Sequence, residues 1–215
     1  MRRPYVTINC AMSTDGKIAS PSGKQLRISS DEDIDRMYCL RNDSDAVLVG
    51  IETVLSDDPK LTVKQACVLE VKNPIRVVLD THCRTPENAL VVNEDAKTLI
   101  ISGKKCDKNF GNNVELIQSE TNKDGLIDLE KLLEILYNYG IKTLMVEGGS
   151  RIIWSFLKQK LVDEMFVYIG PMIIGGKNTP TLADGEGIIK EPIPLEIVEV
   201  QSIGPGILVH YKMIK

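Results

Sequence analysis

The sequence lacks the features that mark membrane proteins and nucleic-acid-binding proteins. No apolar run approaches the roughly 18 residues that a membrane span requires, and basic residues form no long runs. The 26 Lys and Arg residues are outnumbered by 30 Asp and Glu residues, which gives a net charge of −4. Such a chain is a poor partner for nucleic acid. A small anionic ligand is still possible, because it needs only a few local cations.

Cysteine and histidine are scarce and scattered. The five cysteines are odd in number and contain no C-x-x-C pair, and only two histidines occur, His82 and His210. This distribution predicts reduced thiols and argues against a metal site or a disulfide. The N-terminus alternates like a strand and does not resemble an apolar leader. We therefore expect a cytoplasmic, metal-free protein.

Three common functional motifs are also absent. The sequence has no G-x-G-x-x-G, no G-x-x-x-x-G-K-[ST] and no G-x-S-x-G. It therefore lacks the usual dinucleotide fingerprint, the P-loop and the nucleophile elbow of serine hydrolases. We infer that any chemistry comes from a bound cofactor and not from a protein nucleophile.

Strand-like and helix-like patterns alternate along most of the chain, which favours a parallel sheet covered on both faces. The last quarter has strand patterns without helices between them, and Gly204-Pro205-Gly206 predicts a hairpin turn. We expect a single α/β domain over residues 1–215, with a mixed, mostly parallel sheet flanked by helices and an antiparallel C-terminal edge. The expected strands are residues 5–10, 45–50, 75–80, 97–101, 142–147, 165–170, 195–200 and 207–213. The expected helices follow a capping box of Ser29 and Glu32, Gly50, Asp128 and Gly149.

The segment around the double glycine is the strongest local sign of a ligand site. A buried strand ends at Glu147, and Gly148-Gly149 leads directly into a helix that begins near Ser150. A helix N-terminus attracts phosphate, and glycine lets the backbone approach a ligand closely. This pattern alone indicates a nucleotide or phosphate site in an α/β protein.

Two other segments follow predicted strands, where ligands bind in open α/β sheets. Thr53 and Asp57 are one helical turn apart and could contact one ligand, or they could satisfy backbone groups of a turn. Asp80 and His82 follow the next strand, near Arg84. An acidic residue there can bond a ribose and a cation can hold an extra phosphate, so NAD and NADP both stay open.

Taken together, four motifs resemble the riboflavin-biosynthesis reductase family, which has a dihydrofolate-reductase-like fold. The motifs are residues 11–17, residues 49–63 with Asp57-Asp58-Pro59, residues 75–80, and Val146-Glu147-Gly148-Gly149. A late segment with Pro171, Gly175-Gly176 and Thr181 also resembles the family. The resemblance implies an oxidoreductase that uses NADPH, with NADH possible, to reduce the ribosylamino group of a pyrimidinone 5′-phosphate. It also implies a homodimer, for which the C-terminal hairpin offers an edge.

The resemblance assigns roles to individual residues. Glu147 is the first candidate for the catalytic carboxylate, and Asp57 is the second. The cofactor residues would be Ala11, Thr53, Asp57, Thr81, Gly148, Gly149, Ser150 and Arg151, with Asp80 and His82 added from their place after a strand. The substrate residues would be Gln25, Arg41, Leu61, Lys64 and Glu147, with Arg41 and Lys64 as phosphate-binding cations.

Bacterial members of this family commonly carry a zinc deaminase with H-x-E and P-C-x-x-C motifs, and neither motif occurs here. The chain therefore resembles the stand-alone archaeal and fungal reductases. These enzymes act on 2,5-diamino-6-ribosylamino-4(3H)-pyrimidinone 5′-phosphate before deamination. The alternatives are a reductase of the deaminated pyrimidine or of another pterin or pyrimidine, and a nucleotide-binding regulator without turnover.

Overall fold

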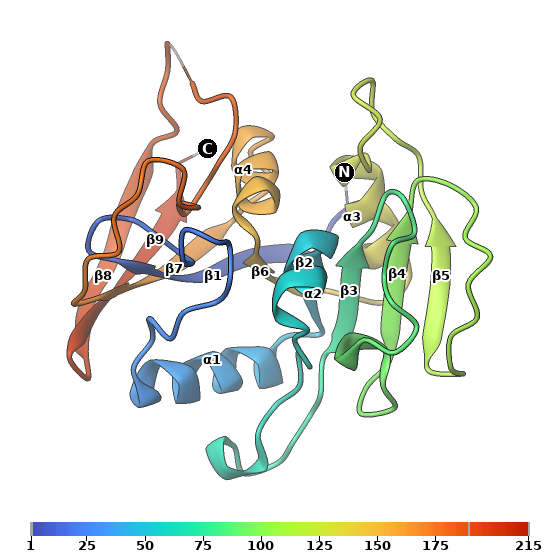
Figure 1. The fold of residues 1–215 in the computed structure, drawn as a ribbon, viewed down its shortest axis with the longest axis horizontal. Helices are drawn as coiled ribbons and strands as arrows, with labels where there is room; N and C mark the ends of the chain where they lie inside the picture. The colour runs from blue at the N-terminus through green and yellow to red at the C-terminus, as the bar shows by residue number, and fades with distance from the viewer. Residues whose placement is uncertain (1, 189, 215) are drawn as a thin grey trace. The chain divides into compact units, whose positions relative to one another are not determined.

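The computed structural model describes residues 2–188 and 190–214. The chain forms two compact units, each built from two segments. Figure 1 shows the course of the chain and labels its helices and strands. The first unit comprises Met1–Tyr5 and Tyr38–Met145, and the second comprises Val6–Met37 and Val146–Lys215. In the described residues, no helix has the length and apolar character needed to span a bilayer.

The first unit contains a parallel sheet. Its strands run in the order β5-β4-β3-β2, and the first half of β6 lies next to β2. The bounds are β2 Ala46–Gly50, β3 Ile75–Leu79, β4 Thr98–Ser102, β5 Val114–Gln118 and β6 Thr143–Gly148. Strands β2 and β4 are buried along their whole length. Such continuous apolar runs are typical of strands covered on both faces, so the sequence pattern and the observed pairing agree.

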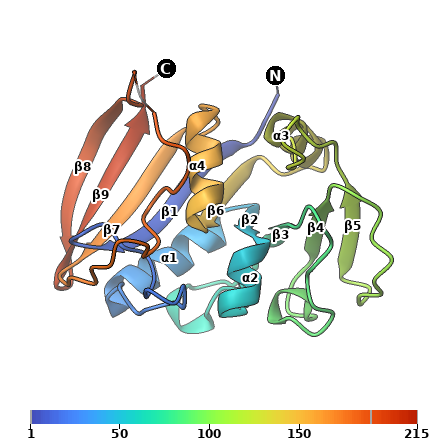
Figure 2. The ribbon, with the colours of Figure 1, turned by 45° about the horizontal axis from the view of Figure 1, so that its top comes forward.

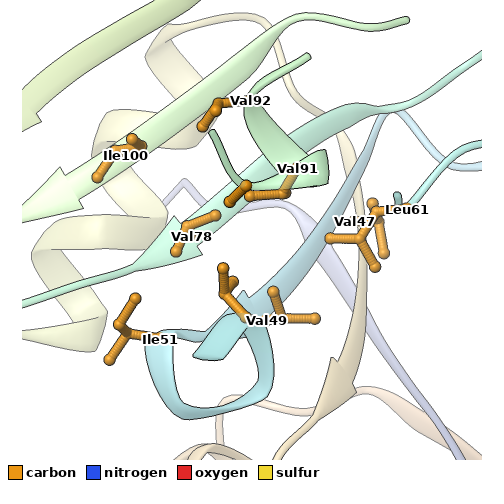
Figure 3. Close-up of a cluster of buried hydrophobic side chains, with 10 residues drawn as sticks. Val47, Val49, Ile51, Leu61, Val78, Val91, Val92 and Ile100 are labelled. Carbon is orange, nitrogen blue, oxygen red and sulfur yellow. The ribbon is translucent and has the colours of Figure 1, made fainter. Parts of the chain in front are cut away.

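Helices α2 (Ile51–Asp57) and α3 (Leu129–Asn138) belong to this unit, and each buries apolar side chains, among them Val54 of α2 and Leu132 of α3. On one face of the sheet, Val49, Val78 and Ile100 lie in register on neighbouring strands and form part of a buried apolar cluster (Figure 3). Helix α3 begins as predicted, because the Asp128 carboxylate accepts hydrogen bonds from the backbone N–H groups of Glu130 and Lys131 at 3.0 and 3.1 Å. Two short 3-10 helices, at Gln65–Cys67 and Leu90–Val92, complete the unit.

The second unit contains the mixed part of the sheet. The second half of β6 is followed by β1, β7, β9 and β8 (Figure 2). Strands β1 (Tyr5–Ser13) and β7 (Glu164–Gly170) are parallel, while β9 (Gly206–Met213) is antiparallel to both β7 and β8 (Leu195–Ile203). The expected mostly parallel sheet with an antiparallel C-terminal edge is therefore confirmed. The last strand in the order is β8, so the open edge belongs to β8 and not to β9.

Helix α1 (Asp31–Asp43) begins one residue later than predicted. The backbone N–H of Asp33 donates to the Ser30 hydroxyl at 3.3 Å, so Ser30 caps the helix and the predicted box of Ser29 and Glu32 is wrong. The two serines are adjacent, and sequence pattern alone does not distinguish them. The last helix, α4, spans Ser150–Lys158.

A polar cluster fixes the start of α1 to the sheet of the second unit. The Arg36 guanidinium donates to the Asn9 side chain at 2.7 Å and lies 5.7 Å from the centre of the Phe166 ring. Phe166 stacks on His210, whose Nε2 is 3.0 Å from a Glu164 carboxylate oxygen. His210 therefore has a structural position in the C-terminal hairpin.

The structure corrects the prediction about cysteine. Cys83 and Cys106 form a disulfide, with Cα atoms 5.6 Å apart. The two residues are 23 positions apart in the sequence, but they lie in the segments that follow the adjacent strands β3 and β4. Scattered spacing and an odd total exclude a fully paired disulfide framework, but they do not exclude one pair that the fold brings together.

Candidate active site

The residues predicted to bind ligands fall into two groups, one in each unit, and each group is described within its own unit. Those in the first unit are Arg41, Thr53, Asp57, Leu61, Lys64, Asp80, Thr81 and His82. Those in the second unit are Ala11, Gln25, Glu147, Gly148, Gly149, Ser150 and Arg151.

In the first unit, two cations meet at one aromatic ring. The Arg41 guanidinium and the Lys64 ammonium each lie 5.6 Å from the centre of the Tyr38 ring. Arg41 is 9% exposed and donates to the Thr62 carbonyl at 2.9 Å. A buried guanidinium and an exposed ammonium near one ring form a suitable receptor for a phosphate group.

The loop that carries Lys64 is held in place by the residues that precede it. Leu61 has φ 53° and is 2% exposed, and its side chain belongs to the buried cluster (Figure 3). The Asp58 carboxylate accepts from the Leu90 backbone N–H at 2.8 Å. The Leu61 side chain therefore anchors the loop in the core. A ligand could contact little more of Leu61 than its backbone.

Arg76 in β3 is the largest buried polar side chain, with no exposed surface. Its guanidinium donates to the Thr98 hydroxyl at 2.9 Å, to the carbonyls of Asn93 and Ala96 at 2.5 Å, and to the Lys60 carbonyl at 3.4 Å. Burial lowers the pKa of Arg76 to about 10, partly opposed by Asp95, so the side chain stays charged at neutral pH. It ties the loop before Leu61 to the segment before β4. The sequence analysis missed this role, although an arginine within an apolar strand was a visible signal.

Helix α2 places Thr53 and Asp57 one turn apart, as predicted, and both are half-buried. The neighbouring Asp58 occupies the end of the helix in a left-handed conformation, with φ 43°. The backbone N–H of Asp58 donates to Val54, and its side chain accepts from Leu90. Asp58 therefore performs the local structural task that was the alternative explanation for Asp57.

The turn after β3 is organised around Asp80. This residue is fully buried, and one carboxylate oxygen accepts from the backbone N–H and the hydroxyl of Thr85 at 2.6 and 2.7 Å. The carboxylate thus closes the turn, which differs from the expected ribose contact. Thr81 is half-buried and His82 is exposed, so a ligand can reach both of these residues of the turn.

In the second unit, the double glycine joins β6 to α4. Gly148 has φ 128°, a conformation available to glycine and unfavourable for other residues. Gly149 precedes the helix, and its carbonyl accepts from the backbone N–H groups of Ile152 and Ile153 at 2.9 and 3.1 Å. Glu147 is half-buried at the end of β6. A strand, a bare glycine backbone and a helix N-terminus thus follow one another directly, as the sequence predicted.

A late carboxylate contacts the first residue of α4. Asp184 accepts from the Thr181 hydroxyl at 2.5 Å and is hydrogen-bonded by Ser150. Burial alone would raise the pKa of Asp184, but these hydrogen bonds from Thr181 and Ser150 lower it overall. Arg151, the next helical residue, is exposed. Ser150 is therefore oriented by the late segment.

The turn at residues 13–17 is bound to the same late segment. The Asp15 carboxylate accepts from the Ser13 hydroxyl at 2.6 Å and from the backbone N–H groups of Ile174 and Gly175 at 3.1 and 2.7 Å. The hydrogen bond from Ser13, followed by that from Ile174, lowers the pKa of Asp15 to about 2. The first motif and the late segment, far apart in sequence, are thus joined. This role of Asp15 was not predicted.

Ala11 and Gln25 occupy different settings in the second unit. Ala11 lies in β1 opposite Tyr168 of β7 and is half-buried. Gln25 is exposed in the segment before α1, where neighbouring Arg27 forms an ion pair with Asp31. Ala11 is therefore placed by the sheet, whereas Gln25 belongs to an irregular surface segment.

Residues 4–209 match the family described as the RibD C-terminal domain. Two relatives, from Archaeoglobus fulgidus and Methanothermobacter thermautotrophicus, are each named 2,5-diamino-6-ribosylamino-4(3H)-pyrimidinone 5′-phosphate reductase. Each is 42% identical over 215 residues; the alignments cover 96% and 97% of this chain and 97% and 98% of those proteins, respectively.

The fold is also similar to a solved structure. The Thermotoga maritima diaminohydroxyphosphoribosylaminopyrimidine deaminase/5-amino-6-(5-phosphoribosylamino)uracil reductase superposes with a TM-score of 0.84 and 28% identity. The match covers 99% of this chain and 57% of that chain, so the present chain spans little more than half of the bifunctional protein.

Proposed function

The chain belongs to the family of RibD C-terminal domains, and we propose that it reduces 2,5-diamino-6-ribosylamino-4(3H)-pyrimidinone 5′-phosphate to the ribitylamino compound. The observation that carries this proposal is the 42% identity to two reductases of that name over nearly their full length. We further propose that residues 1–215 act as a single reductase domain, since the family match at residues 4–209 includes segments of both units.

The proposed cofactor is NADPH, with NADH as the possible substitute. The residues present fit such a group: Gly148 and Gly149 carry no side chain, and the N-terminus of α4 suits a diphosphate. In the first unit, Thr53 and Asp57 would bond ribose hydroxyls, and Thr81 and His82 would contact the adenosine end. When bound, the nicotinamide supplies the hydride.

The protein's part in the reaction is orientation and charge. Alignment of two reactants can lower a barrier by roughly 7–11 kcal/mol, so no strong acid–base pair is required. Glu147 would stabilise positive charge that develops on the substrate or relay a proton through water. Asp57 is the second candidate. Arg41 and Lys64, placed around Tyr38, would hold the substrate 5′-phosphate, with Leu61 and Gln25 as additional contacts.

The experiment follows the nicotinamide absorbance of NADPH with the freshly prepared diamino substrate and, separately, with its deaminated counterpart. We expect oxidation with the diamino compound alone. Oxidation with only the deaminated compound would still agree with the family, but it would mean that deamination precedes reduction. Binding of NADPH without oxidation in either case would favour a nucleotide-binding regulator, and activity on dihydrofolate would favour a related reductase.

We also propose a homodimer in the cytoplasm. Strand β8 is the last strand of its sheet, and it exposes Ile197, Val198 and Val200 at 61, 45 and 59%. An exposed apolar edge strand is usually covered by a partner, and a second copy would cover it here. Sedimentation at micromolar concentration tests this, and a monomer would contradict it.

A further inference from the structure

The segment that follows β4, residues 103–109, lies on the turn that follows β3. The backbone N–H of Gly103 donates to the Thr81 carbonyl at 3.2 Å. A Cβ at position 103 would lie 2.7 Å from the Thr121 methyl group and 3.0 Å from that of Thr81. Glycine therefore fits here because Thr121, after β5, and Thr81, after β3, both lie close to position 103.

Three more bonds fix the segment farther along. Cys106 is joined to Cys83 by the disulfide. The Lys108 ammonium donates to the Thr85 carbonyl at 2.7 Å, and the Asn109 backbone N–H donates to a Glu87 carboxylate oxygen at 2.8 Å. The segment is thus attached to the turn at four successive points and follows it from Thr81 to Glu87.

These attachments gather positive charge beside the turn. Lys104 and Lys105 are exposed immediately before Cys106, and Arg84 is exposed immediately after Cys83. Lys105 pairs with Asp107 at 3.0 Å and Arg84 pairs with Glu52 at 2.6 Å, in both cases with largely exposed side chains. In a chain with a net charge of −4, the two attached segments therefore carry exposed cations, and the exposed His82 belongs to the same turn.

We propose that residues 103–109 form part of the cofactor site, and that Lys104 and Lys105 select the cofactor with a phosphate on its adenosine ribose. This inference rests on the proposed function, in which Thr81 and His82 contact the adenosine end. A ribose phosphate brings close to two negative charges at neutral pH, and NADH lacks that group. The cations would therefore favour NADPH, and the disulfide would keep them beside the turn.

The test uses the full chain and two probes, NADPH and NADH. The dissociation constant of each is measured by titration of nicotinamide fluorescence, and the KM of each is measured with the diamino substrate. In the variant Lys104→Ala/Lys105→Ala we expect NADPH to bind roughly threefold to tenfold more weakly, since exposed ion pairs are individually weak. The binding of NADH should not change, because NADH carries no phosphate for the two lysines to contact.

A matched control is Lys131→Ala, because Lys131 is also an exposed lysine of the first unit with a nearby carboxylate, Glu134 at 3.8 Å. It should leave both cofactors unaffected. Cys106→Ser, and reduction of the wild type with dithiothreitol, should each weaken NADPH more than NADH. Thermal unfolding of each variant checks that the fold is retained.

Equal weakening of both cofactors, or no change in either, would overturn the assignment of the lysines. Unchanged NADPH binding in Cys106→Ser would overturn the role of the disulfide. The two proposals fail separately: an absence of turnover in the wild type with either pyrimidine would refute the proposed reductase, whereas the fluorescence titrations would still decide whether residues 103–109 bind the ribose phosphate.

Discussion

The two units hold their candidate ligand-binding segments by different means. In the first unit, buried polar side chains support the segments: Arg76 holds the loop before Leu61, and Asp80 closes the turn before Thr85. In the second unit, glycine backbone forms the junction at Gly148, and a half-exposed carboxylate, Asp15, holds the late segment by its backbone N–H groups.

This difference predicts how each unit responds to mutation. Removal of a buried guanidinium breaks several hydrogen bonds at once, and each buried group that is left unpaired costs about 1–3 kcal/mol. When a half-exposed carboxylate is removed, water can accept the hydrogen bonds that it accepted. Its removal therefore lowers the free energy of unfolding by less. The first unit should therefore depend on single buried side chains, and the second on backbone conformation.

The largest expected effect is the loss of Arg76. We expect Arg76→Met to lower the free energy of unfolding by about 3 kcal/mol or more, because several buried acceptors each lose a charged donor, and the carbonyls of Asn93 and Ala96 keep only the Asn113 side-chain amide. Urea denaturation measures this change. The matched control is Arg84→Met, since Arg84 is exposed and has one surface ion pair, which contributes about 0–1 kcal/mol. If the two substitutions lowered the free energy of unfolding equally, the first unit would not depend on its buried side chains, and the proposed difference between the units would be wrong.

Much of the fold could be predicted from the sequence, because buried parallel strands produce short apolar runs that stand out from polar surroundings. Strand β5 was missed because Val114–Gln118 is mostly half-buried or exposed and contains two polar residues. The helix cap was misplaced by one residue because Ser29 and Ser30 are adjacent and serine is a favoured N-cap residue at either position. The disulfide was missed because its partners meet only after β3 and β4 have paired.

The candidate site was predictable in part, for a similar reason. Glycine pairs and helix N-termini leave a local signature, so the junction of strand, glycines and helix from Glu147 to Arg151 was predicted correctly, while its role as a ligand site stays a prediction. In each unit, the contacts that hold the candidate ligand-binding segments act over long sequence distances. Arg76 reaches the Lys60 carbonyl, and Asp15 reaches the backbone of Ile174, and neither contact has a local pattern.

The next expected effect compares one carboxylate from each unit. We expect Glu147→Gln to lower kcat roughly a hundredfold, because a positioned proton-transfer or charge-stabilising group contributes about that factor or more. Asp57→Asn should mainly raise the KM for NADPH, with a smaller change in kcat. Steady-state kinetics with the diamino substrate separates these outcomes. A change in KM alone for Glu147→Gln would reduce Glu147 to a binding residue.

A smaller effect compares two arginines. Arg41→Ala in the first unit should raise the KM of the phosphorylated substrate roughly tenfold, since a hydrogen bond to a charged group contributes about 1.5–3 kcal/mol. Arg151→Ala in the second unit should instead weaken NADPH, because Arg151 lies in the first turn of α4. The KM of each ligand is measured for both variants. If each variant weakened both ligands equally, the assignment of separate ligands to the two cations would be wrong.

The smallest effect concerns the pH response of the second unit. The hydrogen bonds from Ser13 and Ile174 lower the pKa of Asp15 from 3.8 to about 2 in the folded protein. The stabilisation that Asp15 provides is therefore complete above the unfolded pKa and is lost as the pH falls through the folded pKa. We expect the wild type to lose more stability between about pH 4 and pH 2 than Asp15→Asn does. Urea denaturation at stepwise lower pH measures this, with Asp124→Asn, at an exposed position of the first unit, as the control for the loss of one carboxylate. Parallel acid responses of wild type and Asp15→Asn would show that the late segment is held by its backbone and glycines, without a contribution from this carboxylate.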